Sequence, residues 1–355
     1  MIAARGRCHL VTLRDVAKAA GVSISTASRV LNNTAEDVGI AEDTKQKVWQ
    51  KAKELNYRPN KMARNLKLGR RPEAILFLFC GSLEAEGGGF LTHPFFSHML
   101  HGIHMAVGRM GRYLVFMNED QRNHRQLKRL LEETVCGVIT WGQLNAKTVE
   151  SLDRIGMPMV CIAPYKGGLK APSVYVDSEG AVRQALQYLY GLGHRRICFV
   201  GPGNPNGAMQ ERLESFRKMA RELGILGQTT IQLCQEAGPM SDVEAGFHAA
   251  LKVLFGTDLR PTAILTPSDL LAIGVMKAAR HTGLEIPKDL SVVGIDNIDR
   301  AADTNPALTT VDIPKERMGM QAATLLEGLL EGEEVGSVKT MIPTRLIIRD
   351  SAAPI

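Results

Sequence analysis

The stretch "TLRDVAKAAGVSISTASRVLN", residues 12–32, decides the fold of the amino-terminal part of the chain. Apolar and small side chains recur at helical spacing before and after Gly21, which predicts two short amphipathic helices joined by a tight turn. Thr12, with Asp15 three residues later, is placed to cap the first helix, and Ser23 to cap the second. This pattern is typical of a helix-turn-helix unit. Spacing alone leaves an ordinary helical hairpin open.

The basic charge of the chain is concentrated in the same part. Residues 1–71 contain 15 Lys and Arg against 6 Asp and Glu, a net charge of +9, whereas the whole chain carries +6. The remaining 284 residues therefore carry −3. A small basic helical module on a mildly acidic body is the charge pattern of duplex DNA binding, because neutralising phosphates supplies much of the affinity. A lysine-rich solvated surface is the alternative.

Length and composition indicate a multidomain protein. With 355 residues, 45% of them hydrophobic, the chain is long enough for two or three domains. The first residues, MIAARGRCHL, contain no apolar core of a signal peptide, and no apolar run approaches the roughly 20 residues of a membrane helix. The six cysteines form no Cys-x-x-Cys pair, and five lie in predicted strands. We therefore expect a protein of the reducing cytoplasm.

A third helix and a short basic helix complete the amino-terminal part. The third helix is predicted from about Thr44 to Asn56. The face that closes the module consists of Val48, Trp49, Ala52 and Leu55. In the stretch 57–73, Pro59 favours a helix that begins directly after it, so a short basic helix is predicted at 60–66. A helix this short needs a partner to form.

From residue 74 onward, apolar strands alternate with amphipathic helices. Strands are predicted at 74–80, 113–118, 136–140, 158–163, 173–177, 196–201, 230–234, 262–266 and 290–296. The alternation indicates an α/β fold of doubly wound parallel sheets. The stretch 164–172 interrupts it, so we expect two lobes divided there, with the last part of the chain completing both. Ligands of such sheets bind beyond the carboxyl ends of the strands, here in the cleft between lobes.

An ordered series of motifs carries a family resemblance. The opening stretch is followed by ELNYRPNKMARNL, HPFF, GHRRICFVG, PTAILTPSDLLAIGVMKAARHTGLEIPKDLSVVGIDN and PALTTVDIP. In this order they resemble the lac repressor and purine repressor family of bacterial transcription regulators over nearly the full length. The resemblance implies a helix-turn-helix headpiece at 1–59, a hinge helix and linker at 60–72, and an effector-binding and dimerisation core at 73–355. The core is expected to be two-lobed and periplasmic-binding-protein-like, with a first lobe at about 73–170 plus 302–332 and a second at about 171–301 plus 333–355.

The resemblance also implies which residues contact DNA. Ile24, Ser25 and Arg29 occupy recognition-helix positions that face base edges, where an arginine pairs best with guanine. Leu66 stands at the position of a leucine wedge that enters the minor groove and kinks the duplex, and packing against the core is its alternative role. The remaining implied contacts, to phosphates or adjacent bases, are Thr12, Arg14, Ser23, Thr26, Ser28, Asn32, Tyr57, Asn60, Lys61 and Ala63.

For the effector, Arg212 and Asp296 match a pair on opposing edges of the cleft. Because the arginine donates and the carboxylate accepts, the two together can hold vicinal hydroxyls. Phe95 and Phe96 would wall the pocket. The other implied effector contacts are Asp120, Asp177, Ser268 and Asp269. Asp269 can instead cap the helix that follows, Asp177 can be a turn residue, and Arg212 can be a surface charge.

The chain departs from the family pattern in three places. The loop at about 33–43 is longer than usual, and Ala41 stands where a capping serine is common. The usual Asp-Arg after the fourth strand of the core is replaced by Ala163-Pro164-Tyr165, and the sequence PMSD at 239–242 has no aromatic for ring stacking. A stacked sugar or purine is therefore less well supported than DNA binding.

Enzyme chemistry is not favoured. The sequence GPGNPNG at 201–207 departs from dinucleotide-loop spacing, and its prolines remove amide donors that a phosphate cradle needs. His98, His101 and His104 share a helix face, but with no Cys or acidic partner in reach the pattern favours a partly solvated helix over a metal site. We expect no enzyme, no cofactor and no metal.

We therefore expect a sequence-specific repressor of sugar or carbohydrate metabolism genes, whose operator binding is modulated by a small polar effector. The end of the chain has no heptad run, which favours a homodimer over a tetramer. One alternative is a corepressor-dependent or global regulator of nucleotide or carbon metabolism. The other is a stand-alone small-molecule-binding or catalytic α/β protein.

Overall fold

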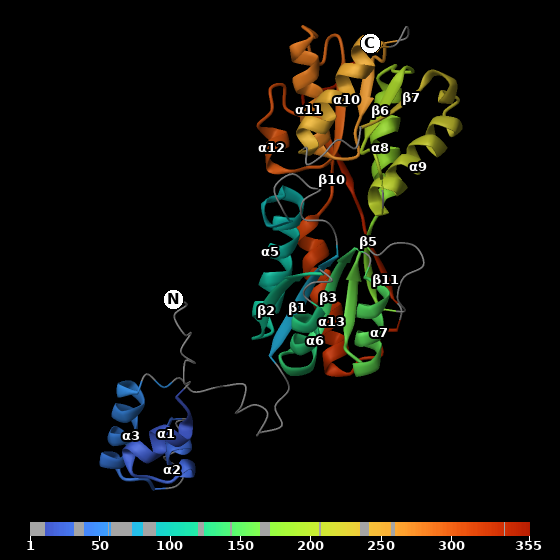
Figure 1. Ribbon diagram of the computed structural model, residues 1–355. Coiled ribbons are helices and arrows are strands. Elements are labelled where there is room, and N and C mark those ends of the chain that lie inside the picture. The colour runs from blue at the N-terminus through green and yellow to red at the C-terminus, as the bar shows by residue number, and fades with distance from the viewer. Residues whose placement is uncertain are drawn as a thin grey trace, which may run out of the picture. The chain divides into compact units, whose positions relative to one another are not determined.

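The computed structural model describes residues 11–31, 39–55, 57, 73–80, 90–119, 124–142, 144–163, 171–205, 207–234, 241–256, 260–336 and 338–355 (Figure 1). The chain divides into two compact units, Met1–Pro72 and Glu73–Ile355. In the described ranges, no helix combines the length and the apolar character that crossing a membrane requires.

The first unit, the headpiece, contains helices α1 (Leu13–Ala20), α2 (Ile24–Leu31) and α3 (Glu42–Glu54). Its core is built from small and β-branched side chains: Val16, Ala17, Ala20, Ala27, Val30, Leu31, Val48 and Ala52. Helix α3 begins two residues earlier than predicted, at Glu42, although Ala41 before it supplies no side-chain cap. Glu42 and Asp43 in the first turn stabilise this helix end through the helix dipole.

One residue predicted for the headpiece core is not there. Val48 and Ala52 are buried and Leu55 is half-buried, but Trp49 is 48% exposed. The buried residues of α3, Val48 and Ala52, lie one turn apart on one stripe of the helix, and Trp49, about 100° around the helix from Val48, lies outside this stripe. The predicted face therefore included one residue too many.

The second unit, the core, contains two six-stranded sheets, and we call each sheet with its helices a lobe. The first sheet has the order β11-β5-β4-β3-β1-β2, with every pairing parallel. The elements of the first lobe are β1 (Ala74–Cys80), η2 (Phe90–Thr92), α5 (Pro94–Arg109), β2 (Tyr113–Asn118), α6 (His124–Glu133), β3 (Val135–Gly142), α7 (Ala146–Ile155), β4 (Met159–Ile162), β5 (Ser173–Val176), α13 (Lys315–Glu331) and β11 (Lys339–Ile342).

The second sheet has the order β12-β10-β9-β8-β6-β7, parallel except for the pairing of β10 with β12. The elements of the second lobe are α8 (Ser178–Gly191), β6 (Ile197–Gly201), α9 (Gly207–Glu222), η4 (Leu226–Gln228), β7 (Thr230–Leu233), α10 (Asp242–Gly256), β8 (Ala263–Leu265), α11 (Asp269–His281), β9 (Ser291–Asp296), α12 (Asp299–Ala302), β10 (Thr309–Asp312) and β12 (Arg345–Ile347). The predicted α/β class with doubly wound parallel sheets is confirmed.

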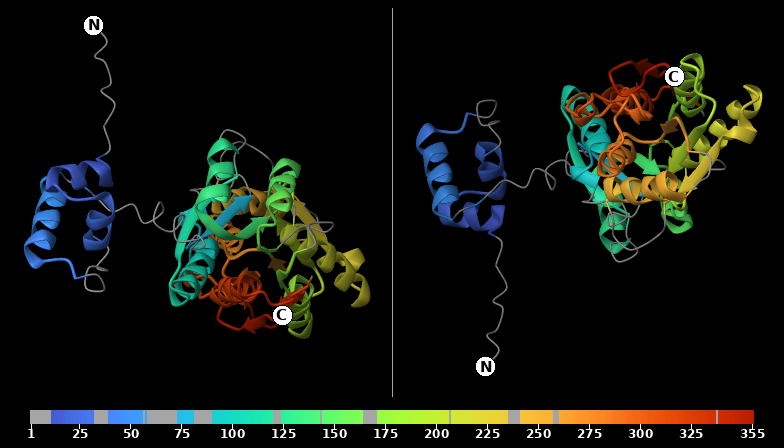
Figure 2. Two further views of the ribbon diagram at one scale, coloured as in Figure 1. Left: turned by 90° about the horizontal axis from the view of Figure 1, so that it is seen from below. Right: turned by 90° about the horizontal axis from the view of Figure 1, so that it is seen from above.

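Helices cover both faces of each sheet, as the end views in Figure 2 show. In β1, Ile75, Phe77 and Phe79 belong to the cluster that contains side chains of α5 and α13. The alternate residues Leu76 and Leu78 belong to the cluster on the other face, which contains side chains of α6 and α7. Both faces of the strand are therefore buried, which explains its unbroken apolar sequence.

The boundaries of the lobes differ from the predicted ones. Strand β5 lies in the first sheet, beside β4 and β11, whereas the segment after 171 was expected in the second lobe. Strand β10 lies in the second sheet and β11 in the first, each opposite to expectation. The chain crosses between lobes at about 177, 313 and 343. The strands before and after 164–172 are neighbours in one sheet, so this interruption of the sequence pattern did not mark a lobe boundary.

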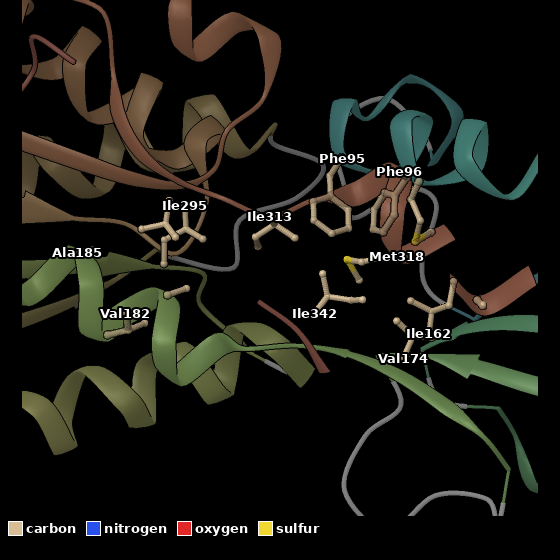
Figure 3. Close-up of a cluster of buried hydrophobic side chains, with 14 of the residues drawn as sticks. Phe95, Phe96, Ile162, Val174, Val182, Ala185, Ile295, Ile313, Met318 and Ile342 are labelled. Carbon is tan, nitrogen blue, oxygen red and sulfur yellow. The ribbon is translucent and has the colours of Figure 1, made fainter. Parts of the chain in front are cut away.

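A continuous apolar cluster joins the two lobes at these crossings. Figure 3 shows Ile313, Met318 and Ile342 between Val182 and Ala185 of the second lobe and the phenylalanines of α5 in the first. The three central side chains are at most 2% exposed. The crossings are therefore packed rather than solvated, so a change in the arrangement of the lobes requires these side chains to repack.

Candidate functional site

The turn between α1 and α2 is built as the sequence predicts. Gly21 adopts a left-handed conformation with φ of 67°, which glycine reaches without steric cost. At the start of α1, the backbone N–H of Thr12 donates to the Asp15 carboxylate over 2.8 Å. At the start of α2, the backbone N–H of Thr26 donates to the Ser23 hydroxyl over 3.0 Å. The two caps fix both helix starts on either side of the turn.

The small headpiece core leaves one face of α2 open to solvent. Ile24 is 42% exposed, and Ser25 and Arg29 are also exposed. Ser25 and Arg29 are four residues apart, so their side chains lie on one helix face. An exposed arginine and a small hydroxyl on the second helix of such a unit are suited to reading base edges in a major groove.

The residues expected to touch phosphates lie around this face. Thr12, Arg14 and Ser23 are exposed, whereas Thr26, Ser28 and Tyr57 are half-buried. The Ser23 hydroxyl also lies 2.8 Å from the Thr26 hydroxyl, so both side chains already serve the helix start. The remaining predicted contacts lie outside the described residues: Asn32, Asn60, Lys61, Ala63 and Leu66.

In the core, the predicted effector pair is found as a direct contact. Arg212 on α9 and Asp296 at the end of β9 are 2% and 4% exposed, and Nη1 of Arg212 donates to Oδ1 of Asp296 over 3.2 Å. The same nitrogen donates to the backbone oxygen of Pro267. Both residues belong to the second lobe, so the expectation that they lie on opposing edges of the cleft is wrong. A ligand they hold must reach the first lobe through other groups.

A buried carboxyl group lies beneath this pair. Asp269 is fully buried, and its carboxyl oxygens accept from the backbone N–H of Ile298 over 2.9 Å and from the Thr310 hydroxyl over 2.5 Å. Burial raises the pKa of Asp269 to about 7, and the charge of Asp296 adds to the rise. Burial also raises the pKa of Asp296, opposed by the charges of Arg212 and Lys315. The ionised form of the pair therefore depends on these two cations.

Three predicted effector residues have structural roles. Ser268, rather than Asp269, caps α11, with its hydroxyl accepting from the N–H of Leu271. The Asp269 side chain is fully buried inside the second lobe, where a ligand cannot reach it. Asp177 caps α8, accepting from the N–H of Gly180 over 2.8 Å, and borders a cavity of about 550 Å³ beside α8 and α9. Asp120 lies outside the described residues.

The first lobe contributes an aromatic wall. The ring of Phe95 lies 5.7 Å from that of Trp141 at the end of β3, at an angle of 61°. Phe96 packs edge-on against Phe95, Trp141 and Phe79 and is 5% exposed. Of the two predicted phenylalanines, Phe95 borders the cavity between the lobes, and Phe96 supports it from behind.

This central cavity lies between the aromatic wall and Arg212. Its first-lobe lining includes Phe95, Trp141 and Tyr175, and its second-lobe lining includes Ser178 and Arg212. Its volume is about 30 Å³, enough for a water molecule or two. A sugar-sized ligand therefore enters only if the lobes separate.

Two buried polar atoms at this cavity have no partner among the described residues. They are Nε of Arg212 and the hydroxyl oxygen of Ser178. A buried donor or hydroxyl without a partner costs about 1–3 kcal/mol. The two atoms together with Asp296 offer donors and acceptors to a hydroxyl-bearing ligand. The aromatic rings offer an apolar surface to the opposite side of the same ligand.

Histidines connect the lobes along one edge of the cleft. Nε2 of His98 on α5 lies 3.1 Å from Oδ2 of Asp299 in the second lobe, and its Nδ1 lies 3.4 Å from Oε1 of Glu316 on α13. Nε2 of His93 lies 3.9 Å from the carboxylate of Asp242. The expectation that no acidic partner is in reach of His98 is therefore wrong. In the described ranges, no group of three or more His, Cys, Asp or Glu side chains is arranged to hold a metal.

Sequence reasoning missed Trp141, Tyr175 and Ser178 as lining residues. Trp141 stands at the carboxyl end of a parallel strand, which is where ligands of such sheets bind, and this position was the available signal. Tyr175 was missed because β5 was assigned to the wrong lobe. No sequence pattern distinguishes Ser178 from an ordinary first-turn serine.

Both units of the chain resemble known protein families. Residues 12–60 match the family described as "Bacterial regulatory proteins, lacI family", and residues 186–352 match "Periplasmic binding protein-like domain". The HTH-type transcriptional repressor CytR of Escherichia coli K12 is 30% identical over 348 residues, with 96% of both chains covered.

Two solved structures share the fold. A lac repressor dimer bound to operator and an anti-inducer superposes with a TM-score of 0.75 at 24% identity, covering 97% of this chain and 99% of that one. A LacI family regulator of Enterococcus faecium with bound ribose superposes with a TM-score of 0.68 at 25% identity, covering 79% of this chain and 99% of that one.

Proposed function

Because the chain belongs to the lacI family of bacterial regulatory proteins, we propose that it is a repressor that binds operator DNA and responds to a small polar ligand. The genes it controls belong to sugar or nucleotide metabolism. Its headpiece binds the duplex, and the cleft of its core binds the ligand. The observation that carries the proposal is the exposure of Ile24, Ser25 and Arg29 on one helix of a headpiece segment with a net charge of +9.

The proposed DNA binding is supported by the basic charge of the headpiece and by the exposed face of α2. Helix α2 enters the major groove, where Arg29 pairs with a guanine and Ile24 contacts a thymine methyl. Thr12, Arg14, Ser23, Thr26, Ser28 and Tyr57 surround this face and contact phosphates or adjacent bases. We assign the minor-groove contact to the segment 60–66, with Leu66 as the inserted side chain and Asn60, Lys61 and Ala63 beside it. A homodimer places two headpieces on a pseudo-palindromic site.

The proposed ligand binding is supported by the buried polar atoms of Arg212 and Ser178 that have no hydrogen-bond partner among the described residues. The ligand carries hydroxyl groups that accept from Arg212 and donate to Asp296. Its less polar face lies against Phe95 and Trp141. Because the pair and the wall belong to different lobes, a ligand that touches both favours one arrangement of the lobes over others. That preference is the free energy available to change operator affinity.

A thermal-shift screen of the full chain tests the ligand half. Sugars and nucleosides are added one by one, since a ligand that binds only the folded state raises the melting temperature. We expect at least one polyhydroxylated compound to do so. The shift should be lost in Asp296→Asn and retained in Lys252→Met, which changes an exposed lysine on α10. A shift that survives in Asp296→Asn would place the ligand elsewhere.

An enzyme that uses the same cleft is the competing function. Its signature would be turnover of the compound found in the screen, measured by mass spectrometry before and after prolonged incubation. We expect the compound to be recovered unchanged, because the described residues that line the cavity include no histidine, cysteine or lysine that could activate the Ser178 hydroxyl, and Arg212 is already paired with Asp296.

A further inference from the structure

Lys315 is a buried lysine at the start of α13, 7% exposed. Its ammonium nitrogen donates to three backbone oxygens: Asp296 over 2.5 Å, Ile313 over 3.1 Å and Asn297 over 3.2 Å. An ammonium group has three N–H donors, so these acceptors satisfy it. Burying a charged group is costly, and a side chain held in this way needs a reason beyond packing.

Two of the three acceptors, the backbone oxygens of Asp296 and Asn297, belong to a turn with an unusual backbone. Asp296 and Asn297 have φ angles of 123° and 52°, both in the region that residues other than glycine rarely adopt. Such conformations persist only where surrounding contacts hold them, and they cluster at functional sites. Here the turn directs the Asp296 carboxylate toward Arg212.

The contacts that hold this turn come from two lobes. From the second lobe, the Asn297 amide nitrogen donates to Asp312 over 3.0 Å, and Arg349 donates to the Asn297 side-chain oxygen over 2.7 Å. Lys315, by contrast, extends from α13, the helix that packs on the first sheet and on α5. Lys315 therefore links the backbone of Asp296, in the second lobe, to a helix of the first lobe by a hydrogen bond.

We propose that Lys315 is a positioning residue that ties the Asp296–Asn297 turn of the second lobe to helix α13 of the first. Any rearrangement of the lobes then changes the presentation of Asp296, and a ligand on Asp296 changes the arrangement of the lobes. The charge of Lys315 also favours the ionised carboxylate of Asp296. The role of Asp296 toward a ligand rests on the proposed function, whereas the tie itself can be measured without ligand or DNA.

The test compares the full chain with two variants. Lys315→Met removes the charge and the N–H donors but keeps the length of the side chain, whereas Lys315→Arg keeps the charge and the donors. Lys252→Met makes the same change at an exposed position. All variants carry Trp49→Phe, so that Trp141, the other of the chain's two tryptophans, reports on the cavity between the lobes. The measurements are hydrogen exchange of the backbone amides and acrylamide quenching of Trp141 fluorescence.

In Lys315→Met we expect the amides at 296–298 to exchange about tenfold faster or more, because a charged hydrogen bond to the turn is lost. Amides of α6, whose side chains belong to the cluster on the other face of the first sheet, should keep their rates. Acrylamide should quench Trp141 more strongly, since the lobes are less tightly held. Lys315→Arg and Lys252→Met should resemble the parent in both measurements.

Three results would overturn the proposal. They are parent-like exchange at 296–298 in Lys315→Met, an arginine variant as defective as the methionine variant, or faster exchange spread evenly over both lobes. If Lys315→Met does not fold, Lys315→Gln takes its place: its neutral amide removes the charge and has only two N–H donors for the three carbonyl oxygens, so faster exchange at 296–298 is still expected. These measurements use no ligand and no operator. A ligand screen without a hit would therefore not contradict the role of Lys315, and parent-like behaviour of Lys315→Met would not contradict the ligand site.

Discussion

Nη1 of Arg212 lies 3.2 Å from Oδ1 of Asp296, and both side chains are almost completely buried beneath the cleft. Arg212→Met leaves the carboxylate buried without its closest cation, so we expect a loss of about 3–5 kcal/mol in the free energy of unfolding. Urea denaturation near neutral pH measures it. The double variant Arg212→Met with Asp296→Asn should lose less than the sum of the two single changes. Strict additivity would mean that the two groups do not interact energetically.

The pKa of Asp269, raised from 3.8 to about 7, predicts a dependence of stability on pH. Between these values the folded protein holds a proton that the unfolded chain releases, so the free energy of unfolding falls as pH rises. Asp269→Asn cannot release a proton, and its stability should change less over this range. Denaturation by urea at several pH values compares the two proteins. Identical slopes would show that Asp269 is ionised throughout.

Two glycines set the close approach of α5 and α13. A Cβ at Gly102 would overlap the backbone oxygen of Glu316, and a Cβ at Gly319 would overlap that of Met99. Gly102→Ala should therefore destabilise the protein by about 1–3 kcal/mol or more through overpacking. Gly108→Ala, on the same helix, has no heavy atom within 4 Å of its new methyl group and should be neutral or slightly stabilising. Equal melting temperatures for the two variants would contradict this packing.

Arg29 is expected to read a base, and Lys53 on α3 is a suitable comparison because it is also basic and exposed. Arg29→Ala should cost about 1–3 kcal/mol of operator binding and relax the preference at one position of each half-site. Lys53→Ala should leave the preferred sequence unchanged. Selection from randomised duplexes with each variant reveals the preference. An unaltered preference in Arg29→Ala would remove the base-reading role from this residue.

The sequence predicted the elements of the fold because their signals are local. The caps at Thr12 and Ser23, the glycine turn at 21 and the apolar strands each depend on residues close together in the chain. The exchange of β5, β10 and β11 between lobes was not predicted, since strand pairing depends on the backbone of distant segments. Trp49 was misplaced because a helical stripe has no sharp edge in sequence.

The candidate ligand site was predicted less completely than the fold. Arg212 and Phe95 line the cavity between the lobes, but only the three-dimensional structure shows that Arg212 and Asp296 share a lobe and already bind each other. Asp177 and Ser268 became helix caps because acidic and hydroxyl side chains at the end of a strand suit both roles. The role of Lys315 depends on backbone oxygens, which no side-chain pattern reveals.

Operator binding by the full chain tests the central claim most directly. A fluorescent duplex obtained by selection is titrated at several salt concentrations, in competition with a random duplex of the same length. We expect affinity to fall by about a thousandfold or more between about 50 and 200 mM salt, and the selected duplex to be strongly preferred at each concentration. Equal affinity for the two duplexes, or an affinity independent of salt, would contradict the assignment of this chain as a sequence-specific repressor.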